Sequence, residues 1–179
     1  MTLRLFVKSD ITKEYISWLN DPVVVRYSNQ RFVRHTKKTC LKYYDSFKKT
    51  NNMLAIILRR SDLSPIGTIT AYQNIHHGTA DVGILIGDKS VWGAGYGQDA
   101  WNAWIDWLLN KKKIRKVTAG TLTCNHAMVK LMRRSGMRRE AIRQKQEVVG
   151  RCLVNTVYYF KYSENEFLHR LSSDKRKIA

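Results

Sequence analysis

The sequence has few cysteines, few prolines, few acidic residues and no long apolar segment. Its three cysteines, Cys40, Cys124 and Cys152, lie far apart without a C-x-x-C pair, which excludes the usual zinc and disulfide patterns and favours a reducing, cytoplasmic setting. The longest uncharged apolar run, residues 53–58, is far shorter than a membrane-spanning helix, and the first residues lack the apolar core of a signal peptide. We therefore expect a soluble, unprocessed protein with no metal site and no membrane contact.

The scarcity of acidic residues leaves a strong positive charge. There are 14 Asp and Glu residues against 32 Lys and Arg residues, which gives a net charge of +18 in 179 residues. With 44% hydrophobic residues, the chain is long enough for one domain, residues 1–179, around a continuous core, and only the basic end, residues 173–179, is typical of a flexible tail. The charge predicts an anionic partner.

Hydrophobic periodicity predicts the element order β-α-α-β-β-β-α-β-α-β-β, without an internal repeat or a linker. We expect Asp10 to be the N-cap of the first helix. A mixed α/β sandwich is the natural packing of these elements. The predicted strands are residues 3–7, 53–60, 66–75, 79–87, 114–122, 137–149 and 151–162, and the predicted helices are residues 11–19, 36–49, 98–110, 125–135 and 164–171.

A glycine-rich segment, V-W-G-A-G-Y-G-Q at residues 91–98, follows a predicted strand and opens a predicted helix. Backbone N–H groups at such a helix start can surround an anion, and glycine lets the backbone approach it closely. A sharp turn alone would also explain the glycines. The loop follows the fourth strand and no acidic residue stands about 20 residues on, so a Rossmann dinucleotide site is excluded. The missing Gly-Lys-Ser/Thr excludes a Walker A loop.

Four segments resemble the signature blocks of the GCN5-related N-acetyltransferase (GNAT) superfamily. Residues 92–97 match its R/Q-x-x-G-x-G/A loop at both small positions, with Trp92 in place of the usual Arg or Gln, and the W-G-x-G-Y-G form is similar to the branch of ribosomal-protein N-terminal acetyltransferases. Residues 125–137 match the block N-x-x-A/S-x-x-L-x-x-K/R-x-G-F/M. Residues 65–67 (P-I-G) and 80–83 (A-D-V-G) resemble the family's third and fourth strands.

This resemblance implies a mixed, mostly antiparallel sheet of six to seven strands, splayed between strands 4 and 5 and flanked by helices on both faces. Acetyl-CoA would lie in the split, with its pyrophosphate on the glycine loop and its pantetheine along strand 4. Lys130 and Arg133 could meet the coenzyme's 3′-phosphate, or simply belong to a solvated helix face. The implied coenzyme-binding residues are Ile84, Leu85, Ile86, Trp92, Gly93, Ala94, Gly95, Tyr96, Gly97, Gln98, Asn125, Lys130 and Arg133.

The implied reaction moves an acetyl group from acetyl-CoA to a primary amine by direct attack in a ternary complex. Asp81 stands where many relatives carry a strand Glu, so it is the candidate base, although an acid on a half-buried strand is more often a hydrogen-bonded or rim residue. Asn125 would touch the coenzyme or the reacting centre. The tyrosine that usually protonates the leaving thiolate is replaced by Met132, and the alternative serine by Ala127. Water or a tyrosine of the last strand would have to serve instead.

The amine acceptor is framed in this family by the first two helices and the last strands. The expected acceptor-binding residues are Trp18, Asn20, Tyr27, Arg31, His76 and Tyr158. Residues 18–22 (W-L-N-D-P) resemble relatives that acetylate nucleotide-linked amino sugars, although the motif occurs in protein-acetylating members too. The charge favours an anionic small molecule or peptide over a polyamine.

Two acceptors therefore stay open, a nucleotide-linked amino sugar, which the sequence mildly favours, and a protein N-terminus. The sequence also leaves a homodimer open. A rival from another class is a non-catalytic basic domain that binds nucleic acid, supported by the basic run at residues 111–116 but by no RRM, KH or helix-turn-helix signature. A third reading is a coenzyme-binding regulator that has lost turnover, because both usual proton donors are absent.

Overall fold

A computed structural model describes residues 1–163 of the chain. The predicted helix at residues 164–171 and the basic tail lie outside the described residues. Within them the predicted order of strands and helices is confirmed. The elements are β1 (Thr2–Leu5), α1 (Lys13–Asn20), α2 (Lys37–Lys48), β2 (Met53–Leu58), β3 (Pro65–Asn74), β4 (Thr79–Ile86), α3 (Tyr96–Asp106), β5 (Lys116–Leu122), α4 (His126–Arg134), β6 (Arg138–Val149) and β7 (Cys152–Tyr162).

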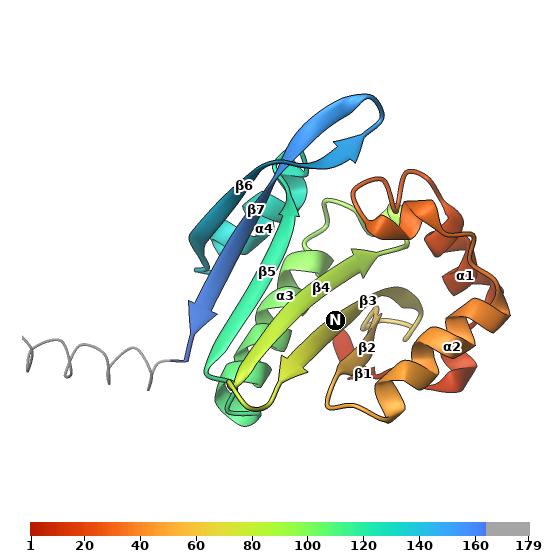
Figure 1. Cartoon of the computed structure of the whole chain (residues 1–179). Helices are drawn as coiled ribbons and strands as arrows, with labels where there is room; N and C mark the ends of the chain where they lie inside the picture. The colour runs from red at the N-terminus through yellow and green to blue at the C-terminus, as the bar shows by residue number, and fades with distance from the viewer. Residues whose placement is uncertain (164–179) are drawn as a thin grey trace, which may run out of the picture.

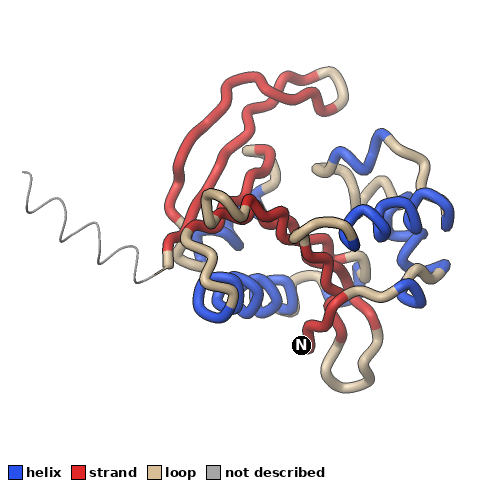
Figure 2. The backbone as a smooth tube through the Cα atoms, turned by 60° about the horizontal axis from the view of Figure 1, so that its bottom comes forward, coloured by secondary structure: helices blue, strands red, loops and turns tan. Residues whose placement is uncertain are grey.

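The strands form one seven-stranded sheet in the order β1-β2-β3-β4-β5-β7-β6 (Figure 1). Every neighbouring pair is antiparallel except β4 and β5, which are parallel because α3 crosses between them. Helices α1 and α2 cover one face, and α3 and α4 cover the other, so helices lie on both sides of the sheet in Figure 2. This is the predicted fold class.

The alternation of side chains along β2 shows why the sheet has two cores. Leu54, Ile56 and Leu58 are buried with the aromatic residues of α1 and α2. Ala55 and Ile57 point to the other face and join the core that contains the buried tryptophans of α3. The tryptophans of α3, predicted to be core residues, include Trp101, which is 0% exposed.

The sheet opens between β4 and β5. These two strands pair only at three positions, Thr79 with Lys116, Ala80 with Val117 and Asp81 with Thr118, and they diverge beyond Asp81 (Figure 1). From Val82 onward, β4 stays paired with β3 on its other edge. The backbone edge of residues 82–86 that faces β5 therefore has no strand partner among residues 1–163.

The first helix begins later than predicted, and the expected N-cap was wrong. Thr12 caps α1 by accepting a hydrogen bond from the Tyr15 amide. Asp10 instead accepts two hydrogen bonds from the Arg4 guanidinium and one from the Val7 amide. The buried Asp10 carboxylate therefore ties β1 to the chain before α1 instead of capping the helix.

Candidate active site

The glycine loop between β4 and α3 is open on the side that a ligand would approach. Gly93 and Gly95 have φ values of +80° and +87°, and a Cβ built at either position meets no atom within 4 Å. Gly95 is the N-cap of α3 in the left-handed conformation and brings no capping side chain. The first amides of this 11-residue helix are therefore available to an anion at the positive end of the helix dipole.

Two side chains fix this loop in place. The indole of Trp92 donates a hydrogen bond to the Ile86 carbonyl at 3.0 Å, which anchors the loop to the end of β4. The amide of Gln98 donates to the Leu131 carbonyl at 3.3 Å and so joins the start of α3 to α4. Ala94 is exposed, and Tyr96 is half-buried against the core. The predicted loop residues thus form one continuous surface at the end of β4.

The predicted pantetheine strand borders the same opening. Ile84, Leu85 and Ile86 are half-buried, and their β5-facing edge is the unpaired edge described above. Unpaired backbone N–H and C=O groups in a sheet accept a further extended segment readily. An open loop for a pyrophosphate beside an unpaired strand edge for pantetheine fits acetyl-CoA.

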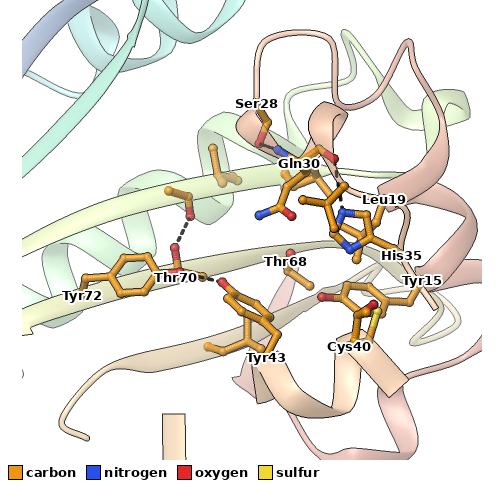
Figure 3. Close-up of a pocket in the computed structure, with 16 residues that line it drawn as sticks. Tyr15, Leu19, Ser28, Gln30, His35, Cys40, Tyr43, Thr68, Thr70 and Tyr72 are labelled. Carbon is orange, nitrogen blue, oxygen red and sulfur yellow. Dashed lines mark hydrogen bonds between the residues drawn. The ribbon is translucent and has the colours of Figure 1, made fainter. Parts of the chain in front are cut away.

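Of the cavities beside α1 and the segment after it, two reach strand β4. We call the larger one the tyrosine cavity; it has a volume of about 350 Å³. Its lining comes from α1, α2, the segment between them and strands β2, β3 and β4 (Figure 3). The lining residues are Tyr15, Leu19, Ser28, Gln30, Val33, His35, Thr39, Cys40, Tyr43, Leu54, Thr68, Thr70, Tyr72, Gly83, Ile84 and Leu85.

We call the second one the aspartate cavity; it has a volume of about 240 Å³. It is lined by Tyr27, Asn29, Arg31, Asp81, Gly120, Leu122, Glu147, Thr156 and Tyr158. Residues 27–31 contribute side chains to both cavities, so this segment stands between them. The structure thus brings together four residues predicted from far-apart segments, Asp81, Tyr27, Arg31 and Tyr158.

Asp81 stands at the last paired position before the split. Its carboxylate accepts a hydrogen bond of 2.8 Å from the Thr118 hydroxyl. Desolvation by the surrounding protein raises the pKa of Asp81 above its ordinary value, although part of the side chain stays open to the cavity and the Thr118 hydrogen bond offsets part of the rise. A carboxylate with a raised pKa at a cavity wall is suited to accept a proton.

Arg31 and Tyr158 come from opposite sides of the aspartate cavity. The Arg31 guanidinium donates to the Ser28 carbonyl at 2.9 Å and to the Val148 carbonyl at 3.1 Å, with Glu147 at 4.0 Å. It therefore ties the segment between α1 and α2 to the β6–β7 hairpin. The ring of Tyr158 fits over Gly120, where a Cβ would collide with it, and the Arg143 guanidinium lies 4.8 Å from the ring centroid.

Asn125 has a structural task at the start of α4. Its side-chain oxygen accepts from the Met128 amide at 3.3 Å and its side-chain nitrogen donates to the Thr121 hydroxyl at 3.0 Å. Lys130 and Arg133 are exposed, three residues apart on one side of the helix. Met132 is 0% exposed, so this position offers no proton donor to the site.

Three predicted acceptor residues lie elsewhere. Trp18 is 7% exposed and its ring packs over Gly87 in the core, so it lines neither cavity. Asn20 bridges the carbonyl of Ile16 and both backbone groups of His35. His76 lies in the turn between β3 and β4, at the end of β4 opposite the glycine loop, roughly 25 Å away at about 3.3 Å per residue.

Sequence reasoning missed most of the tyrosine cavity. Tyr15, Cys40 and Thr68 are buried and recur at the spacing of ordinary core positions. The sequence does carry one signal for the cavity. Tyr43, Thr68 and Thr70 place hydroxyl groups at inward-facing positions where aliphatic residues are usual.

The family model for the acetyltransferase (GNAT) domain matches residues 1–138 of the sequence. The chain belongs to the GNAT acetyltransferase family. A search of curated proteins gave no match. In the part of the chain that the structure describes, no cluster of three His, Cys, Asp or Glu side chains could hold a metal ion, and no helix has the length and apolarity to span a membrane.

Solved structures of GNAT proteins share the fold. The spermidine N-acetyltransferase of Vibrio cholerae in complex with CoA and spermine has a TM-score of 0.81 and 15% identity, over 93% of this chain and 97% of that one. A GNAT-family acetyltransferase of Bacillus anthracis gives 0.76 and 18%, over 90% and 94%. The ribosomal-protein-S5-alanine acetyltransferase of Vibrio fischeri gives 0.70 and 16%, over 91% and 93%. This GNAT protein is thus an N-acetyltransferase whose donor is acetyl-CoA.

Proposed function

We propose that this acetyltransferase acetylates a primary amine by direct attack of the amine on acetyl-CoA, with the amine held beside Asp81. The observation that carries the proposal is the position of Asp81. It lies where β4 and β5 begin to separate, in the wall of a polar cavity, and burial raises its pKa. The split on one side and the cavity on the other would let donor and acceptor meet at this point.

The chemistry needs a neutral amine, a polarised thioester and a proton for the leaving thiolate. Asp81 would accept the ammonium proton, directly or through a water molecule. Holding both reactants in one cleft supplies much of the acceleration, so few side chains are indispensable. Because Met132 is apolar and Asn125 is held by Thr121 and Met128, we expect solvent to protonate the thiolate.

The charges around the cavities argue against a polyamine, although structural neighbours include spermidine acetyltransferases. No Asp or Glu lines the tyrosine cavity. In the aspartate cavity, Glu147 lies beside the Arg31 guanidinium, which leaves Asp81 as the one acidic lining residue without a cationic neighbour among the described residues. A polycation would gain little here and would approach a chain of net charge +18.

The two acceptors that the charge allows are an amine on an anionic or uncharged small molecule and the amino terminus of a protein. Ribosomal-protein-alanine acetyltransferases among the structural neighbours support the second. A thiol-release assay with acetyl-CoA and a panel of nucleotide-linked amino sugars, peptides with free N-termini and spermidine distinguishes them. We expect turnover with a member of the first two classes, and a marked loss in Asp81→Asn.

The same preparation tests the rival class of function. Calorimetric titration with acetyl-CoA should show micromolar binding, whereas a single-stranded RNA oligonucleotide should show none at physiological salt. RNA binding without acetyl-CoA binding would overturn the proposed function. Acetyl-CoA binding without thiol release for any amine would instead support a regulator that has lost turnover.

A further inference from the structure

The tyrosine cavity is uncharged in a strongly basic protein. None of its lining residues is Asp, Glu, Lys or Arg, while the whole chain carries a net charge of +18. Most of its polar side chains carry hydroxyl groups: Tyr15, Ser28, Thr39, Tyr43, Thr68, Thr70 and Tyr72. The volume of about 350 Å³ lies at the lower end of the roughly 300–1,000 Å³ typical of small-molecule pockets.

Two of these hydroxyls open to the cavity and have no protein partner among residues 1–163. Tyr15 is 4% exposed and Thr68 is 7% exposed, and neither hydroxyl makes a hydrogen bond to any residue in 1–163. In Figure 3 the Tyr15 side chain reaches from α1 toward Thr68 on β3, across the floor of the cavity. Burial raises the pKa of Tyr15, so this hydroxyl stays protonated and keeps its hydrogen to donate. Because both hydroxyls line the cavity and no described residue occupies them, they can donate to and accept from a ligand there.

The other polar groups of the cavity are held in defined positions. The hydroxyls of Tyr43 and Tyr72 are hydrogen-bonded to each other at 2.7 Å, and the Thr70 hydroxyl donates to the Gly83 carbonyl at 3.3 Å. The His35 ring lies 3.3 Å from the Gln30 carbonyl. The ring of Tyr15 is itself packed against Phe6, with 5.1 Å between the ring centroids. The cavity is therefore a preformed arrangement of hydroxyl groups and aromatic rings.

We propose that the tyrosine cavity binds an uncharged, polyhydroxylated ring, which makes the acceptor of this enzyme an amino sugar. This inference rests on the proposed function and narrows its substrate class. Hydroxyl groups both donate and accept, so Tyr15 and Thr68 match the hydroxyls of a sugar, and tyrosine rings pack against its C–H faces. A polyamine would need carboxylates that the cavity lacks. The cavity reaches Gly83, which lies two residues beyond Asp81 on the same face of β4, about 7 Å along the strand, so an amine at that end of a bound ring would point toward the proposed base.

A binding experiment tests the ligand class without relying on turnover. The probe is N-acetylglucosamine, titrated by NMR into the protein saturated with CoA, so that the coenzyme site is already filled. Tyr15→Phe and Thr68→Val each remove one hydroxyl and keep the shape, and we expect each to raise the dissociation constant about three- to tenfold. Tyr44→Phe is the matched control, because Tyr44 packs on Phe6 outside the cavity, and it should change nothing.

A kinetic experiment adds the comparison of acceptors. Glucosamine and cyclohexylamine present a primary amine on a six-membered ring, with and without hydroxyls. We expect kcat/KM to be at least tenfold higher for glucosamine, and Tyr15→Phe to reduce that preference through KM. Absence of sugar binding to the CoA complex, or binding that both cavity variants leave unchanged, would overturn the inference even if another amine is acetylated. Sugar binding with the expected variant effects but no acetylation of any amine would uphold the ligand class and refute the proposed function.

Discussion

Substitution of Gly95 tests quantitatively whether the glycine loop binds the coenzyme pyrophosphate. Gly95 has φ +87° and no atom within 4 Å of a built Cβ. Gly95→Ala therefore costs backbone strain of about 1–2 kcal/mol but creates no collision within the protein. That strain should lower the Tm by about 2–8 °C in a chain of this length. The added methyl occupies the space that a pyrophosphate would need, so the dissociation constant for CoA should rise as well.

Gly95→Asp adds a negative charge to the same position. Opposite a pyrophosphate at about 5 Å, each pair of charges repels by roughly 1–3 kcal/mol for effective dielectric constants between bulk water and the protein surface. The dissociation constant for CoA should then rise by about 10- to 100-fold or more.

The assay is calorimetric titration of CoA into each variant, with Tm measured in parallel. Gly150→Ala is the matched control. Gly150 has φ +61° and equally open surroundings, but it lies in the β6–β7 turn. It should show the same loss of Tm with unchanged CoA affinity. Equal CoA affinity in all three variants and the native protein would refute the assignment of the loop.

Substitutions at Asp81, at Thr156 and Thr121, and at Asn125 give four further predictions. Asp81→Asn should abolish the fall of kcat/KM at low pH. In the native protein we expect that fall above pH 3.8, because burial raises the pKa of Asp81. If the fall is the same in the variant, Asp81 is not the base. Because the folded state holds this proton more tightly than the unfolded chain, the carboxylate costs stability once the pH exceeds its folded pKa, so Asp81→Asn should be more stable than the native protein at neutral pH and not at pH 3. The buried Thr156 hydroxyl has no hydrogen-bond partner, so Thr156→Val should raise the free energy of unfolding by about 1 kcal/mol. Thr121→Val removes the acceptor for the Asn125 side chain and should lower the free energy of unfolding. Denaturant unfolding measures both variants, and destabilisation by both would contradict the prediction. Asn125→Ala should lower the free energy of unfolding by about 1–2 kcal/mol, because it removes the N-cap of α4. Asn125→Asp keeps the accepting oxygen and should lower it by less than half as much. Equal losses in denaturant unfolding would show that the cap is not the cause.

Much of the fold was predictable because local signals and tertiary packing agree. Alternating residues in β2 and the helical stripe of Trp101 and Trp104 in α3 predict the buried faces that the structure shows. The error at Asp10 has a tertiary cause. Asp10 is a typical capping residue and stands two positions before Thr12, the true cap. Its role is decided by the ion pair with Arg4 on β1, a contact between two segments that local sequence patterns do not connect.

The candidate site was predictable where it depends on a contiguous motif. Residues 92–98 follow one another in the chain, so their open loop could be expected from glycine alone. The cavities could not be expected in the same way, because Asp81, Arg31 and Tyr158 meet only through the sheet order and the return of the β6–β7 hairpin. Trp18 illustrates the opposite error, since an aromatic residue beside a polar helix end looks available in sequence but fills the space over Gly87.

Amide hydrogen exchange with and without CoA tests the central claim most directly. If the coenzyme lies in the split of the sheet, its addition should slow exchange at residues 83–86 of β4 and at residues 93–97 of the glycine loop. Exchange in the β1–β2 pair should stay unchanged. Binding of CoA that leaves both segments unprotected, or that protects only the basic surface of α4, would contradict the account.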